Sequence, residues 1–104
     1  MATYDPTLKR FRATLDGVYG SRVERAVLYG SRARGDARPD SDYDIAVFLR
    51  GYADFGREAG TLAEIETTLL NETGAIINSL PFPEKAWQSQ TGLMQEIRRE
   101  GIEI

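Results

Sequence analysis

The chain has 104 residues, with 13 Lys and Arg against 16 Asp and Glu, and it contains neither Cys nor His. This length predicts a single domain over 1–104 with a small core, so a fully walled substrate pocket is not expected without a partner. The missing Cys and His exclude disulfides, imidazole bases, Ser-His-Asp triads and the usual zinc sites. The net charge of -3 argues against broad binding to DNA. We find no apolar run of membrane-spanning length and no secretion signal, so we expect a cytoplasmic protein without a membrane partner.

A helix and then a short strand are predicted at the start of the chain. Asp5 followed by Pro6 is typical of a helix start. Apolar residues then recur at steps of three or four, as an amphipathic helix requires: Leu8, Phe11, Leu15 and Val18. Residues 25–29 indicate a short buried strand.

The turn that follows this strand has the composition of a phosphate-binding segment. Gly30 permits a sharp turn and lets a ligand approach the backbone closely. Ser31 is expected to cap a short helix and leave free N–H groups at its start, where a phosphate binds well. Three arginines make the segment locally basic: Arg32, Arg34 and Arg38.

Two carboxylates follow this turn at a fixed distance. Ten residues separate Ser31 from Asp42, and Asp44 comes two positions later, at the start of a strand predicted over 43–49. Side chains two apart in a strand point to the same side, so these carboxylates lie together and repel each other unless a cation binds between them. The pair therefore predicts a site for Mg²⁺, or Mn²⁺, that also contacts the phosphates held by the turn.

The second half of the chain predicts one more strand between helices. An apolar spacing indicates a long helix from Phe55 to Leu69. A strand is expected over 75–80, stopped by Pro81 and Pro83, and one or two helices over 84–99 close the chain. The predicted fold class is α/β (α+β), with a small mixed sheet of three to four strands covered by helices.

These motifs carry a resemblance to a known family. The segments Gly30-Ser31-Arg32-Ala33-Arg34-Gly35 and Ser41-Asp42-Tyr43-Asp44-Ile45-Ala46-Val47, and the tail Glu100-Gly101-Ile102, resemble the minimal nucleotidyltransferase (MNT) domains of the DNA polymerase beta superfamily. The likeness covers nearly the whole chain and implies the nucleotidyltransferase fold. It implies that the metals are coordinated by Asp42 and Asp44, and that the phosphates are bound by Gly30 and Ser31. The local positive charge makes Arg32 and Arg34 further candidates for binding the phosphates.

The resemblance also implies an activity and a partner. MNT proteins of this length resemble the antitoxins of two-gene modules whose toxin is a HEPN protein. The expected reaction is Mg²⁺-dependent transfer of AMP from ATP to a hydroxyl of that partner, releasing pyrophosphate. Complete members of the superfamily carry a third carboxylate on a neighbouring strand. Here Asn78 is the nearest polar substitute, and Glu72 could reach the site only if its loop bends back.

The missing carboxylate keeps a second hypothesis open: an inactive pseudo-nucleotidyltransferase that neutralises a HEPN-type toxin by binding alone. An antibiotic-modifying enzyme is a weaker alternative, because such enzymes usually carry a further domain for the drug. Arg34 is explained equally well by a ligand contact and by an ion pair with Asp36 or Asp42. Three aromatic residues are expected to pack rather than to stack on a base: Tyr29, Tyr43 and Trp87.

Overall fold

The computed structural model describes residues 5–104. Its elements confirm the predicted alternation of helices and strands, with an additional short strand at the end. In chain order they are α1 (Pro6–Tyr19), η2 (Gly20–Arg22), β1 (Val23–Tyr29), α2 (Ser31–Arg34), β2 (Tyr43–Leu49), α3 (Phe55–Thr73), β3 (Ile77–Pro83), η3 (Glu84–Gln88), α4 (Gly92–Glu100) and β4 (Ile102–Glu103).

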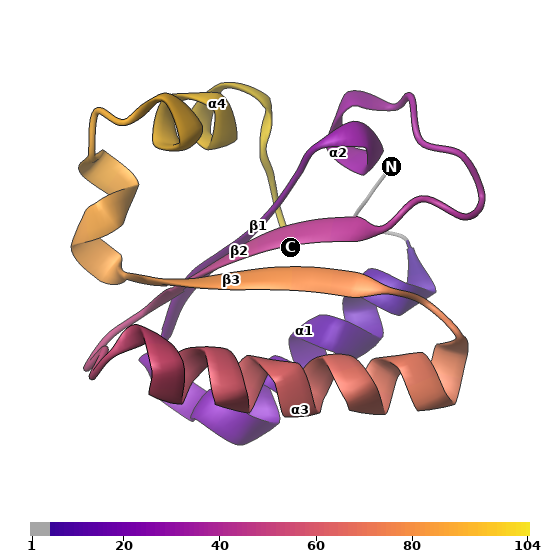
Figure 1. Cartoon of the computed structure of the whole chain (residues 1–104), viewed down its shortest axis with the longest axis horizontal. Helices are drawn as coiled ribbons and strands as arrows, with labels where there is room; N and C mark the ends of the chain where they lie inside the picture. The colour runs from indigo at the N-terminus through magenta and orange to yellow at the C-terminus, as the bar shows by residue number, and fades with distance from the viewer. Residues whose placement is uncertain (1–4) are drawn as a thin grey trace.

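The four strands form one mixed sheet in the order β3-β2-β1-β4. β1 pairs antiparallel with both β2 and β4, whereas β2 and β3 are parallel and joined by the α3 crossover. Helices α1 and α3 cover one face of this sheet and α4 lies on the other (Figure 1), while the short helix α2 follows the end of β1 and packs its Ala33 against the core of α1 and α3. The predicted class, a small mixed sheet covered by helices, is confirmed. No helix in residues 5–104 is long and apolar enough to span a membrane.

Helix α1 begins as predicted, but its buried face differs at the last apolar step. The Asp5 side chain accepts a hydrogen bond from the Thr7 N–H at 2.8 Å. The expected burial of Val18 is wrong, because this side chain is 54% exposed and Tyr19 is buried instead. The buried stripe takes a four-residue step from Leu15 to Tyr19. It therefore passes Val18 on the outer face of the helix.

Strand β3 runs through the prolines that were expected to stop it. The Ser79 N–H points away from β2 and donates to Glu66 Oε2 of α3 at 2.8 Å. Successive residues of a strand alternate in direction, so Pro81 and Pro83 occupy outward positions where no bond to β2 is lost. This edge of the sheet therefore offers few donors to a pairing strand from another chain.

The smaller core layer lies beneath α4. It is built from Val27, Ala46, Phe48, Met94 and Ile97. Trp87 meets the Phe48 ring edge-on, with centroids 5.4 Å apart, as the expected packing role requires. Tyr29 packs against this layer, and Tyr43 is buried on the opposite face in the larger core with α1 and α3.

A buried carboxylate joins the far end of the sheet to α3. Glu58 is 1% exposed, and its Oε2 accepts hydrogen bonds from Arg22 Nη2 and from the Ala53 N–H. Arg22 also donates to the carbonyl oxygens of Arg50 and Gly51 at 2.9 and 3.0 Å. The network closes the loop between β2 and α3 against η2.

Replacing Glu58 by alanine is expected to lower the free energy of unfolding by about 2 kcal/mol, because Arg22 loses its anion and the Ala53 N–H loses its acceptor. The cost is smaller than for a fully buried pair because the Arg22 side chain is 36% exposed. Urea unfolding followed by circular dichroism measures it. Glu64→Ala, on the exposed face of α3, is the control and should change the value by less than about 0.5 kcal/mol.

Candidate active site

The turn after β1 depends on a single glycine. Gly30 has φ 76° and ψ -157°, a conformation that side chains disfavour, and it is the N-cap of α2. The expected capping role of Ser31 is therefore wrong, because Ser31 is already the first residue of the helix and no side chain caps it. The carbonyl of Gly30 instead accepts from the N–H groups of Ala33 and Arg34. Within residues 5–104, the N–H and hydroxyl of Ser31 have no hydrogen-bond partner.

The structure brings this turn against the carboxylate pair. A Cβ added to Gly30 would lie 2.6 Å from Asp44 Oδ2, so the Asp44 carboxylate packs directly on the glycine. Asp44 is the second residue of β2 and Asp42 precedes the strand, while Tyr43 between them points into the α1 side of the core. The two carboxylates therefore share the opposite face, as the sequence predicts.

The environment of Asp44 disfavours its charged form. Burial raises the pKa of the Asp44 carboxyl, a hydrogen bond from Asn78 lowers it, and the neighbouring Asp42 charge raises it again; the net direction is upward. A carboxylate held in this way gains from a nearby cation.

Asn78 occupies the facing position on the adjacent strand. The parallel register pairs Asp44 with Asn78, and Asn78 Nδ2 donates to Asp42 Oδ2 at 2.9 Å. The amide thus contacts the pair from β3. Glu72 does not take this place: it pairs with Arg10 of α1 at 2.7 Å, on the face of the sheet that α1 and α3 cover.

These groups fit one kind of cation site. Among residues 5–104, no group of three or more Asp, Glu, His or Cys side chains is placed to hold a metal. Two carboxylates on one face are nevertheless a common protein contribution to Mg²⁺, whose remaining ligands are waters and substrate phosphates. The donor set fits a cation shared with a phosphate ligand, and it does not form a complete protein cage.

Arg32 is engaged on the other side of β2. Its guanidinium lies 4.0 Å from the centroid of the Tyr43 ring and donates to the Ser41 carbonyl oxygen at 2.7 and 3.0 Å. It also donates to the carbonyl oxygens of Arg38 and Pro39. These contacts hold the loop that carries Asp42 in place.

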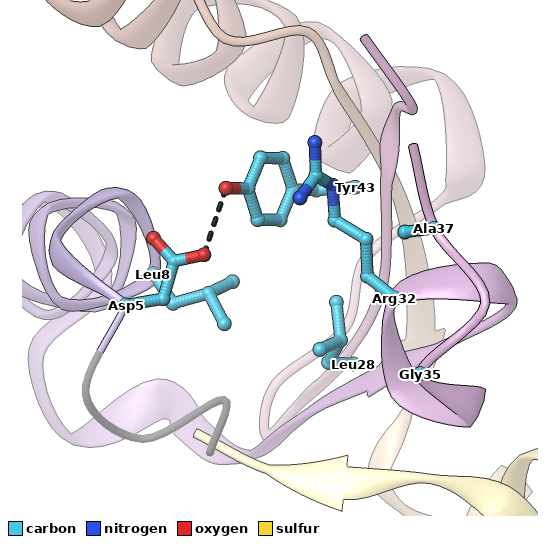
Figure 2. Close-up of a pocket in the computed structure, with 7 residues that line it drawn as sticks. All are labelled: Asp5, Leu8, Leu28, Arg32, Gly35, Ala37 and Tyr43. Atoms are coloured by element: carbon cyan, nitrogen blue, oxygen red, sulfur yellow. Dashed lines mark hydrogen bonds between the residues drawn. The ribbon is translucent and has the colours of Figure 1, made fainter. Parts of the chain in front are cut away.

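The pocket beside Arg32 is separate from the carboxylate face. Figure 2 shows Tyr43 donating a hydrogen bond to Asp5 Oδ2, at 2.8 Å, across this pocket of about 220 Å³. The lining residues are Asp5, Leu8, Leu28, Arg32, Gly35, Ala37 and Tyr43. Since Tyr43 points away from Asp42 and Asp44, the pocket lies behind the strand that carries them.

Arg34 forms ion pairs with two acidic residues, neither of which is Asp42. Its Nε lies 3.3 Å from Asp36 Oδ2, and its Nη1 lies 3.3 Å from Glu100 Oε1. The pairing with Asp36 is one of the alternatives that the sequence leaves open. Glu100 also accepts the Gly30 N–H at 3.1 Å. Sequence reasoning misses this role of Glu100, because a hydrogen bond across 70 residues leaves no local pattern.

Replacing Gly30 by alanine is expected to cost about 1–3 kcal/mol of stability and to displace Asp44, because the new methyl group strains the backbone and collides with the carboxylate. Gly17→Ala is the matched control: a Cβ there meets nothing within 4 Å, and alanine in the last turn of α1 should stabilise the helix by at most about 0.5–1 kcal/mol. Urea unfolding of both variants tests the contrast. Equal stability of Gly30→Ala and the parent would rule out the strained contact.

Comparison with known proteins finds a related sequence and two related folds. Over 86 residues the chain is 30% identical to "Putative protein adenylyltransferase MJ0604" of Methanocaldococcus jannaschii, covering 83% of this chain and 80% of that protein. Two solved structures share the fold. One is a toxin–antitoxin crystallised with AMP-PNP, at TM-score 0.66 and 19% identity, covering 91% of this chain and 70% of that one. The other is a mutant of the toxin–antitoxin MntA-HpeT, at TM-score 0.67 and 17% identity, covering 95% and 72%.

The match to a protein family decides the assignment. Residues 18–104 match the family described as Polymerase beta, Nucleotidyltransferase, a span that includes the turn, the carboxylate pair and α4. The chain therefore belongs to the polymerase beta nucleotidyltransferase family.

Proposed function

We propose that this chain is a Mg²⁺-dependent nucleotidyltransferase that moves AMP from ATP to a hydroxyl of a partner protein. The contact of the Asp44 carboxylate with Gly30 carries the proposal. It places the two carboxylates, which would bind the cation, beside the N–H of Ser31, which has no hydrogen-bond partner within the described residues. The adenylyltransferase name of the M. jannaschii relative supports AMP as the transferred group. The AMP-PNP in a structural neighbour supports ATP as the donor.

The reaction assigns a task to each part of the site. An acceptor oxygen attacks the α-phosphorus of ATP, the bond from that phosphorus to the bridging oxygen breaks, pyrophosphate leaves, and the hydroxyl proton passes to water. Asp42 and Asp44 would hold Mg²⁺, which when bound neutralises charge that builds on the phosphates. The phosphates would be received by the N–H and hydroxyl of Ser31, where Gly30 allows close approach.

The two arginines are assigned different parts. Arg34 is about half exposed and would exchange part of its contact with Asp36 for a phosphate oxygen. We assign Arg32 mainly to holding the loop before Asp42, because its guanidinium already donates to three loop carbonyls.

The acceptor we propose is a HEPN-type toxin encoded beside this chain. The structural neighbours described as toxin–antitoxin proteins support a toxin partner. A domain of this size also leaves much of its surface exposed, so a partner can complete the substrate site. A neighbouring gene that encodes a HEPN-like protein would support the pairing without deciding whether transfer occurs.

One observation favours a second candidate function. Asn78 stands where a third carboxylate could face Asp44, and an amide cannot accept a proton as a base does. The alternative is a pseudo-nucleotidyltransferase that neutralises the same partner by binding alone. One feature argues against this alternative. The two carboxylates repel each other when no cation is bound, so a protein that only binds its partner would be more stable without them.

Labelled ATP distinguishes the two functions. The purified chain is incubated with Mg²⁺, ATP labelled on the α-phosphate, and either the neighbouring gene product or an extract of the host. Transfer predicts label on a discrete protein, lost with Asp42→Asn or with a chelator and retained with Asp40→Asn, an exposed aspartate in the same loop. Saturable Mg·ATP binding without label would favour the binding module, and unchanged labelling by Asp42→Asn would reject the proposed metal site.

A further inference from the structure

Glu100 joins the last turn of α4 to the turn that holds Gly30. Its Oε1 accepts the Gly30 N–H at 3.1 Å and lies 3.3 Å from Arg34 Nη1. The Glu100 side chain is 14% exposed, so these two contacts replace most of the water that a free carboxylate would bind.

Gly30 therefore lies between two carboxylates from different elements. Asp44 of β2 packs against its Cα, and Glu100 of α4 accepts its N–H. A glycine with φ 76° has no side chain to fix its orientation, so the partner of its N–H helps to determine the direction of the following peptide, which carries the Ser31 N–H.

The position of Glu100 in its own helix is electrostatically unfavourable. Carbonyl groups at a helix C-terminus repel a negative charge and favour a positive one. The two preceding residues, Arg98 and Arg99, follow this preference and Glu100 does not. Its contacts with the Gly30 N–H and Arg34 offset the repulsion, which explains how an acidic residue is accommodated here.

The end of α4 is itself held in place. Met94 and Ile97 are buried against the sheet, and a Cβ on Gly101 would overlap the Ile97 carbonyl oxygen and the Val27 side chain. The following residues pair with β1 as β4. The carboxylate of Glu100 is thus carried by a rigid support that is independent of α2.

We propose that Glu100 is a positioning residue for nucleotide binding: it fixes the Gly30 turn so that the Ser31 N–H and Arg34 face the phosphates of a nucleotide whose cation would be held by Asp42 and Asp44. This inference rests on the proposed function. It adds α4 to the machinery of a site whose other groups all come from residues 30–44 and β3. Glu100 touches no reacting atom in this role.

Two substitutions separate the hydrogen bond from the charge. Glu100→Ala removes both, whereas Glu100→Gln keeps a side-chain oxygen that can accept the Gly30 N–H. Glu103→Ala is the control, because that side chain is 65% exposed and its distance to Arg25 is 3.7 Å. Calorimetry measures the affinity for Mg·AMP-PNP, and NMR hydrogen exchange measures the protection of the Gly30 amide.

Glu100→Ala is expected to weaken Mg·AMP-PNP binding about tenfold and to speed exchange at Gly30 by a similar factor. Glu100→Gln should stay within about threefold of the parent in both measurements, and Glu103→Ala should match the parent. Binding by Glu100→Ala within about twofold of the parent would overturn the proposal, as would a glutamine variant as weak as the alanine variant. A parent chain that binds no Mg·AMP-PNP would overturn the proposed function as well.

Discussion

Replacing Asp44 by asparagine is expected to reduce nucleotidyl transfer at least about a hundredfold and to raise the melting temperature at pH 7. The loss follows because one of the two carboxylates proposed to hold the cation disappears. The gain follows because burial and the neighbouring Asp42 charge disfavour the ionised form of Asp44, which is reflected in its raised pKa. The site is thus expected to exchange stability for function.

The pH dependence of that gain has a definite sign. The pKa of Asp44 is higher in the folded chain than in the unfolded one, so the folded state is penalised once the carboxyl ionises. The advantage of Asp44→Asn should therefore be present at pH values above the folded pKa. This advantage should shrink as the pH falls through the pKa of Asp44 in the folded chain and then through its pKa in the unfolded chain.

Thermal unfolding of the parent and Asp44→Asn between pH 7 and about pH 3.5 measures this difference. Added Mg²⁺ should stabilise the parent more than the variant, because only the parent keeps both carboxylates. Asp42→Asn is the companion variant: it should lose transfer and keep the fold, with a smaller thermal effect because Asp42 is exposed. A lower melting temperature for Asp44→Asn at pH 7 would contradict the assigned burial cost.

Replacing Asn78 by aspartate is expected to speed transfer about tenfold to a hundredfold, which lies at or below the lower limit of the range for a positioned base. Asn78 faces Asp44 across the parallel register and contacts Asp42, so its replacement places a third carboxylate beside the pair. The same change should lower the melting temperature without Mg²⁺, because three like charges then share one face. The transfer rate with α-labelled ATP and a melting curve with and without Mg²⁺ measure both effects.

Asn78→Ala provides the comparison for this gain. It removes the amide contact with Asp42 and adds no base, so its transfer rate should not rise above that of the parent. If only Asn78→Asp transfers nucleotide and the parent does not, the parent is the binding module of the second hypothesis. A rate for Asn78→Asp equal to or below that of an active parent would show that this position does not supply the missing base.

Much of the fold could be predicted because its signals are local. Each signal spans only a few neighbouring residues of its own element. This is true of the Asp5 cap, of the apolar steps in α1 and α3, and of the buried run in β2. The position of the two aspartates beside the Gly30 turn could also be predicted. β1 and β2 are neighbouring strands, and their register places Asp44 beside Tyr29, the residue before Gly30.

Other features escape sequence reasoning because distant contacts decide them. Prolines in β3 are tolerated because β3 is an edge strand, which depends on the order of the sheet. The two-residue strand β4 is too short to have a periodic pattern of its own. The contact between Glu100 and Gly30 depends on how α4 packs, and the partners of Arg32 depend on the path of residues 38–41.

The most direct test of the site is a calorimetric titration with Mg·AMP-PNP of the parent, Asp42→Asn and Asp40→Asn. We predict saturable binding by the parent that requires Mg²⁺, affinity reduced at least about tenfold in Asp42→Asn, and unchanged affinity in Asp40→Asn. Equal affinity in the parent and Asp42→Asn, or no Mg²⁺-dependent binding by the parent, would contradict the assignment of a nucleotide and metal site to the Gly30 turn and its carboxylate pair.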